Sequence, residues 1–164
     1  MAMKYDAKWF TDVSLKAFGY LIGQFGFSAI ELPQPCNEGE MPFYTILFKN
    51  KEGQFVLLTL APTQHQLELS FGVDADPFGQ PREVYLHEYL QLVDPEGRHK
   101  LGWGPSTPDF LKNELTRASK LLEKYADPFF QRHEQFWPEV ERLRQEIWAK
   151  KQTEIKGMTR DAQT

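Results

Sequence analysis

Residues 43–73, FYTILFKNKEGQFVLLTLAPTQHQLELSFGV, decide the fold. Two runs, Phe43–Phe48 and Gln54–Leu60, are apolar on both faces, as strands buried in a sheet are. Residues 49–53 between them have the composition of a hairpin loop. After a short turn, apolar and polar residues alternate from His65 to Val73, which is typical of an antiparallel strand with one side in water. The stretch therefore predicts a three-stranded antiparallel meander.

Helical patterns lie on both sides of this meander. From Asp6 to Phe25, apolar residues recur at three- and four-residue intervals, and Gly26 is a candidate C-cap. The segment 83–93 fits either a strand or a helix. We favour a short helix after Val84, with a hairpin that returns through residues 101–103 as the alternative.

The C-terminal third of the chain predicts helices. Thr107 can cap a helix whose first position is Pro108, and the Asp-Pro pair at 127–128 ends that helix and begins the next. Pro138 is expected to break or kink the second helix, because a proline inside a helix removes a backbone hydrogen bond. The apolar pattern then continues to about Lys151.

This order of elements predicts an α+β fold. Runs of strands followed by runs of helices favour an antiparallel sheet with helices packed on it, and a doubly wound nucleotide-binding fold is not expected. We expect a single domain over residues 1–151, with an N-terminal helix, a meander of three or more strands and C-terminal helices on the sheet. Residues 152–164 are polar without an apparent apolar period and are predicted to be a frayed tail.

Composition indicates a soluble protein of a reducing compartment. The chain has 164 residues, of which 41% are hydrophobic and 26% charged, the balance of an ordinary globular protein. Its one cysteine, Cys36, excludes an intrachain disulfide. The N-terminus lacks the apolar stretch of a signal peptide, and the most apolar segment, 55–62, is far too short to cross a bilayer. We therefore predict a cytoplasmic protein with no membrane partner.

Charge is distributed unevenly along the chain. Between Glu31 and Glu96 there are eleven acidic and three basic residues, a net charge of −8, whereas the rest of the chain has a net charge of +4. Because the acidic stretch contains the predicted sheet, we expect the sheet side to carry a negative field. Such a field disfavours nucleic acid as a ligand and favours a basic partner.

No set of residues predicts catalysis or a cofactor. The four histidines, at positions 65, 87, 99 and 133, are too far apart in sequence for a familiar zinc site. The loop from Asp74 to Gly79 begins like a calcium loop, but Phe78 and Tyr85 stand where such a loop needs oxygen ligands. Cys36 has no neighbouring cation or histidine to activate it. The sequence therefore predicts a protein that is not an enzyme and uses no cofactor or metal.

One stretch carries a family resemblance. The order helix, meander, then a helix running into Leu121–Phe130 (LLEKYADPFF) resembles small bacterial α+β proteins of unknown function. Several families of that shape are immunity proteins encoded beside toxins. The resemblance implies a protein that binds and inhibits a toxin, and it carries over no site residue.

The leading functional prediction is a non-enzymatic protein-binding protein, an immunity-type inhibitor that docks an acidic surface on a basic partner such as a toxin domain. The residues predicted to bind the partner are Glu38, Glu40, Asp74, Asp76 and Trp148.

Two alternatives remain open. One is a small-molecule-binding protein or enzyme with a pocket between the sheet and the helices, where His87, Glu88 and His133 would converge. The other is an oligomerisation module that uses Trp148 and the last helix.

Overall fold

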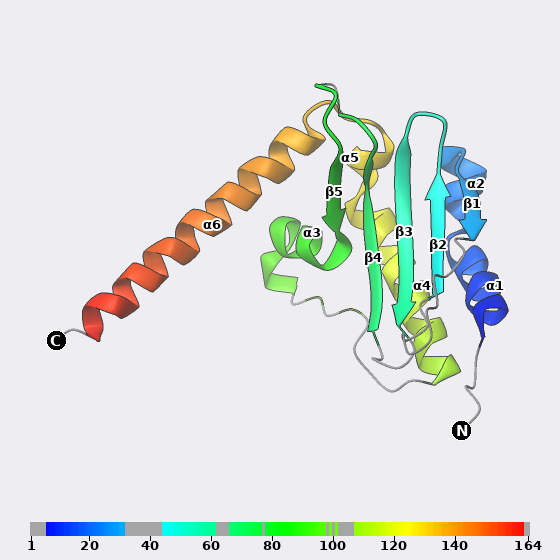
Figure 1. The fold of residues 1–164 in the computed structure, drawn as a ribbon, viewed down its shortest axis with the longest axis horizontal. Helices are drawn as coiled ribbons and strands as arrows, with labels where there is room; N and C mark the ends of the chain where they lie inside the picture. Colours follow the sequence, from blue (N-terminus) through cyan, green and yellow to red (C-terminus); the bar gives the residue numbers. More distant parts are fainter. Residues whose placement is uncertain are drawn as a thin grey trace, which may run out of the picture.

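A five-stranded antiparallel sheet forms the centre of the molecule, with its strands in the order β1-β2-β3-β4-β5 (Figure 1). A computed structural model describes residues 6–31, 44–61, 66–76, 78–97, 99, 101 and 107–162, with the side chains of residues 31 and 66 left out. The strands are β1 (Ser28–Glu31), β2 (Tyr44–Lys49), β3 (Gln54–Ala61), β4 (Gln66–Val73) and β5 (Arg82–Tyr85). The predicted meander is therefore present and gains one strand at each edge.

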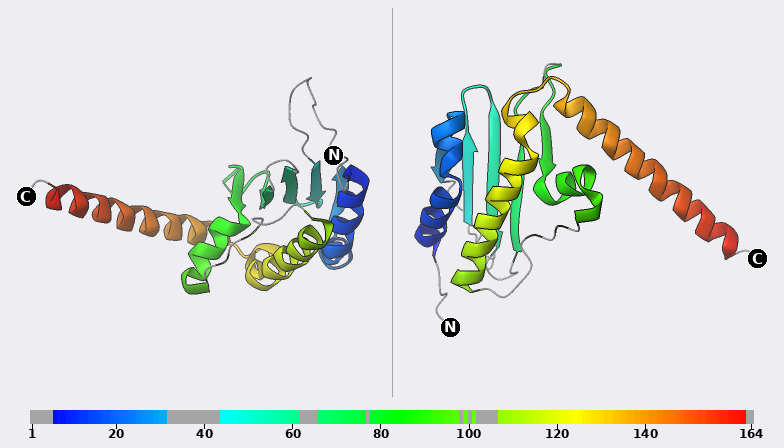
Figure 2. Two further views of the ribbon diagram at one scale, coloured as in Figure 1. Left: turned by 90° about the horizontal axis from the view of Figure 1, so that it is seen from below. Right: turned by 180° about the vertical axis from the view of Figure 1, so that it is seen from behind.

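Alternate residues of the central strands point into the core. Val56 of β3 stands between Phe48 of β2 and Phe71 of β4 in the strand register, and all three side chains are fully buried. The helices lie on this face of the sheet, as the edge-on view shows (Figure 2, left). This arrangement is the α+β fold that the sequence predicts.

The opposite face of the sheet is less exposed to solvent than the alternation in β4 predicts. Ser70 and Gly72, which were expected in water, are buried. Gly72 is opposite Phe55 in the register, and a Cβ at position 72 would lie 2.9 Å from the Phe55 ring. The same Cβ would lie 2.0 Å from the Arg82 carbonyl oxygen, and this close approach of the β5 backbone explains why the smallest residue stands there.

Two consecutive helices replace the single N-terminal helix expected from Asp6 to Phe25. They are α1 (Ala7–Ala17) and α2 (Gly19–Phe25), and Phe18 between them has φ −107° and ψ 17°. Asp6 caps α1 by accepting a hydrogen bond from the Trp9 N–H at 2.8 Å. Gly26 ends α2 in the left-handed region at φ 69°, which confirms the predicted C-cap.

The ambiguous segment 83–93 contains both a strand and a helix. Strand β5 ends at Tyr85, and α3 (Leu86–Val93) follows at once, so the favoured short helix after Val84 is confirmed. A 3₁₀ turn, η1 (Pro95–Gly97), comes next. The competing hairpin reaches residues 102–103, which lie outside the described residues.

Helix α4 (Pro108–Tyr125) packs across the core face and is joined to the N-terminal helices. Thr107 caps it and Pro108 opens it, as predicted. The Ser119 hydroxyl donates to the Ala17 carbonyl at 2.6 Å, and the Tyr20 hydroxyl donates to the Ser119 carbonyl at 3.2 Å. These bonds satisfy polar groups at the contact between the helices.

The C-terminal helices differ from the prediction at two points. The helix begun at the Asp-Pro pair is only α5 (Asp127–Phe130), and after a turn with Arg132 at φ 54°, α6 (Phe136–Asp161) begins. Pro138 therefore lies in the first turn of α6, where its missing N–H costs no helical bond, and it does not break the helix.

Helix α6 also continues through the segment expected to be a frayed tail. It ends at Asp161 rather than near Lys151. Half of residues 152–161 are good helix formers, and Ile155 and Met158 continue the three- and four-residue spacing beyond Lys151. The distal half of α6 projects away from the sheet and its covering helices (Figures 1 and 2).

Candidate functional site

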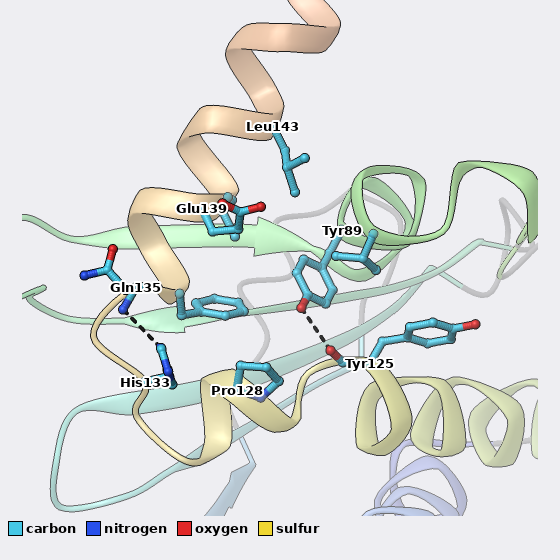
Figure 3. Close-up of a pocket in the computed structure, with 10 residues that line it drawn as sticks. Tyr89, Tyr125, Pro128, His133, Gln135, Glu139 and Leu143 are labelled. Atoms are coloured by element: carbon cyan, nitrogen blue, oxygen red, sulfur yellow. Dashed lines mark hydrogen bonds between the residues drawn. The ribbon is translucent and has the colours of Figure 1, made fainter.

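A cavity of about 500 Å³ lies where α6 leaves the body of the protein (Figure 3). Helix α3 forms one wall, the first half of α6 forms another, and the end of α4 with α5 forms the third. Its lining residues are Tyr89, Val93, Tyr125, Pro128, His133, Gln135, Phe136, Glu139, Val140 and Leu143.

The turn between α5 and α6 sets the angle of this cavity. Gln54 of β3 is buried, and its Nε2 donates to the Phe129 carbonyl at 2.6 Å, which fixes α5 against the sheet. The left-handed residue Arg132 then reverses the chain, and Phe136 and Trp137 anchor the start of α6 in the aromatic core. Aromatic packing therefore holds the first turns of α6 while leaving the space beside α3 open.

The two tyrosines of the cavity are committed to internal hydrogen bonds. The Tyr89 hydroxyl donates to the Tyr125 carbonyl at 2.9 Å, and burial raises the pKa of Tyr89 to about 12, so its phenol stays protonated. The Tyr125 hydroxyl donates to Asp94 at 2.8 Å, and His99 contacts the same carboxylate oxygen at 2.8 Å. The His99 and Tyr125 hydrogen bonds hold the pKa of Asp94 below its ordinary value.

Glu139 and His133 at the cavity also have polar partners. Glu139 forms an ion pair with Arg142, whose hydrogen bond lowers the pKa of Glu139. The Gln135 N–H donates to His133 Nδ1 at 3.3 Å. Among the described residues, no three His, Cys, Asp or Glu side chains converge to hold a metal ion. The cavity walls are mostly apolar, so its chemistry suits the burial of apolar groups.

An apolar stripe on α6 starts in the cavity and continues beyond it. Residues on one side of the helix change from buried at its base to exposed at its far end. Val140 is buried, Leu143 and Ile147 are half-buried, and Trp148, Ile155 and Met158 are 65%, 55% and 72% exposed. We call these six residues the apolar stripe and residues 148–161 the arm. The arm therefore presents apolar side chains to water.

The sequence-predicted site residues lie on different elements. Asp74, after β4, is exposed and forms an ion pair with Lys49 at 2.5 Å. Asp76 is buried and accepts hydrogen bonds from the N–H groups of Phe78 and Gln80 and from Arg82, the Gln80 bond being the main reason its pKa is lowered. Trp148 lies on the arm, and Glu38 and Glu40 lie outside the described residues.

The residues of the small-molecule alternative do not converge. Of His87, Glu88 and His133, only His133 lines the cavity. Glu88 forms an ion pair with Arg144 of α6 at 2.7 Å, which ties α3 to α6. His87 is exposed, with its ring near that of Tyr85.

Ion pairs neutralise part of the charge that the sequence concentrates between residues 31 and 96. In the part of the chain that the structure describes, acidic residues of that stretch pair with lysine or arginine, including cations from the C-terminal part of the chain. Such pairs include Lys49–Asp74, Arg82–Asp76, Arg132–Glu52 and Arg144–Glu88. The fold thus brings together charges that the sequence separates.

The features of this site that the sequence prediction missed are the cavity and the arm. The apolar pattern was expected to continue along the helix to about Lys151, and the structure places Leu143 and Ile147 half-buried at an edge between the body and water. Ile155 and Met158 were the available signal, since each lies three or four residues from a neighbour on one face of the helix.

Comparisons with known proteins add no relative, because no protein-family model, curated protein or solved structure matches the chain. In the part of the chain that the structure describes, no helix has both the length and the apolar character needed to cross a membrane.

Proposed function

We propose that the protein is a non-enzymatic protein-binding protein that engages its partner with the arm and the cavity at its base. The observation that carries this proposal is the apolar stripe, which leaves the buried core at Val140 and ends in water at Met158. Contiguous exposed apolar surface of this kind marks interaction sites in soluble proteins.

The length of the stripe favours a protein partner over a small molecule. Val140 and Met158 are eighteen positions apart on one helix, a distance of about 27 Å along its axis. A cavity of about 500 Å³ alone falls in the range of small-molecule sites. The exposed side chains of Trp148, Ile155 and Met158 lie outside it and suit the apolar face of another helix.

The immunity-type inhibitor remains the finer form of this proposal. Its acidic docking surface would include the sheet face opposite the helices, where Glu83 of β5 stands opposite Gly72 of β4 and Glu68 lies four residues before Gly72 on β4. Reversing the charges of Glu38 and Glu40 together should slow association with a basic partner and weaken its salt dependence. An affinity for the partner that depended neither on this charge reversal nor on ionic strength would contradict the electrostatic part of the proposal.

Affinity capture from the native host tests the arm as the binding surface. The bait is the full chain, and the test variant is Ile155→Glu combined with Met158→Glu, which places two charges on the apolar stripe. Thr153→Glu is the matched control, because Thr153 is exposed on the opposite side of the same helix. We expect the wild-type and control chains to retain a partner that the double variant loses. Equal retention by all three chains would contradict the proposal.

A small-molecule-binding protein is the second candidate, favoured by the volume of the cavity and by His133 in its wall. Leu143→Trp should fill the cavity without disturbing the core, because Leu143 is only half-buried. Thermal stabilisation of the wild type, but not of this variant, by one compound from a metabolite library would support it. Stabilisation of both chains would place the ligand elsewhere.

A further inference from the structure

We infer that the partner of the arm is a second copy of this chain, an inference that rests on the proposed function. In this homodimer the two α6 helices run antiparallel. The arm of each copy lies along the first half of the other copy's α6 and closes the cavity there. Each site is therefore completed by residues of the other protomer.

Four of the six residues of the apolar stripe stand opposite apolar residues of an antiparallel copy. With the twofold axis level with residue 149, Met158 of one helix stands opposite Val140 of the other, and Ile155 stands opposite Leu143. Val140 and Leu143 both line the cavity. The two most distal apolar residues of the arm thus meet two of the three apolar α6 residues that line the cavity.

The charges of α6 favour the same direction. Residues 136–147 contain three acidic and two basic residues, a net charge of −1. The arm, residues 148–161, contains four basic and two acidic residues, a net charge of +2. An antiparallel pair sets each positive arm against a negative first half, and this register also places Glu154 opposite Arg144. A parallel pair would instead set the two positive arms side by side.

The wall of the cavity formed by α3 is suited to receive an apolar side chain. Val93, at the end of α3, is 38% exposed, and it lines the cavity together with Tyr89. Arg144 Nε of α6 lies 2.7 Å from Glu88 Oε1 of α3. This ion pair joins the two helices and fixes the distance between these two walls of the cavity. Met158 of the other copy would enter this space beside Val93 and exclude water from both side chains.

The arm has little support from its own chain. Its residues are exposed apart from the half-buried Gln152, and Gly157 lowers the helix propensity of its last turns. Short helical segments without tertiary packing are marginal in water. Pairing with a second copy would supply the packing that one chain lacks.

Analytical ultracentrifugation of the full chain over a range of concentrations tests the dimer. We expect a concentration-dependent monomer–dimer equilibrium in the wild type. Ile155→Glu should raise the dissociation constant by about a hundredfold or more, because each dimer loses two buried isoleucines. Thr153→Glu adds the same charge on the opposite side of the helix, so it controls for the change in net charge, and it should raise the constant far less than Ile155→Glu does. Circular dichroism of each chain confirms that the fold is retained.

Disulfide crosslinking tests the direction of the pair. In a background with Cys36→Ser, a chain carrying Leu143→Cys is mixed with a chain carrying Ile155→Cys under mild oxidation. The antiparallel register predicts a disulfide between the two different chains. Crosslinks only between identical Ile155→Cys chains would show a parallel pair and overturn the inference.

The outcomes separate this inference from the proposed function. The inference that the partner is a second copy is overturned if the wild-type chain stays monomeric at every concentration. It is also overturned if Ile155→Glu leaves the dissociation constant of the dimer unchanged. Loss of a different host protein by the arm variant in the capture experiment would still support the proposed function. Absence of both effects would overturn the two together.

Discussion

Removing residues 152–164 should leave the stability of the body almost unchanged. The deleted segment begins beyond the last half-buried apolar residue of the stripe, Ile147, and its described side chains are exposed apart from that of Gln152. Changes to surface positions that make no tertiary contact alter the free energy of unfolding by about 0.5 kcal/mol or less. By contrast, Val140→Ala removes methyl groups from a side chain that is 2% exposed and should cost about 2 kcal/mol.

Urea unfolding followed by circular dichroism measures both effects. All chains are compared at the lowest usable protein concentration, because association with a second copy would add apparent stability. The account requires the truncated chain to match the wild type and Val140→Ala to unfold at lower urea. A loss of 2 kcal/mol or more on truncation would instead show that residues 152–164 pack on the body of their own chain.

Three further predictions concern the body of the protein. Gly72→Ala should destabilise it by about 1–3 kcal/mol in urea unfolding, because the new Cβ would lie 2.0 Å from the Arg82 carbonyl oxygen. Ser14→Ala should stabilise it by about 1 kcal/mol in the same assay, because the buried Ser14 hydroxyl has no hydrogen-bond partner among the described residues. The pKa of Asp76 is lowered in the folded protein, so its ionised form stabilises the fold above about pH 4, the ordinary pKa of aspartate. This stabilisation is lost as the pH falls through the lower pKa of the folded state. The free energy of unfolding of Asp76→Asn should therefore be lower than that of the wild type at neutral pH and approach it in acid. A difference in this free energy that stayed constant across the pH series would contradict the prediction.

Local sequence patterns were sufficient to predict the sheet and most of its covering helices. The alternation from His65 to Val73 and the caps at Gly26 and Thr107 depend on backbone geometry within a few residues, so they can be read without tertiary information. The edge strands β1 and β5 were harder to predict, because each has only four residues, too few for a clear alternation of apolar and polar residues. Each strand forms by hydrogen bonding to one neighbouring strand, β2 or β4.

The course of α6 depends on tertiary contacts that no local pattern contains. Pro138 was expected to break a helix because the turn at Arg132 was not foreseen, and that turn moves Pro138 to a first turn where proline is tolerated. Ion pairs such as Arg144–Glu88 join residues 56 positions apart, so the net charge of one stretch does not by itself give the charge of a surface. The cavity arises from the same long-range packing.

Hydrogen exchange of the arm amides shows whether the arm is stabilised by a second copy or by its own chain. Residues 148–161 of the full chain are followed at a low and at a high protein concentration, with the α4 amides as an internal reference. The account predicts that the arm exchanges quickly when dilute and becomes protected when concentrated, while α4 is protected throughout. Protection of the arm that does not depend on concentration would contradict it, because the arm would then be stabilised by its own chain.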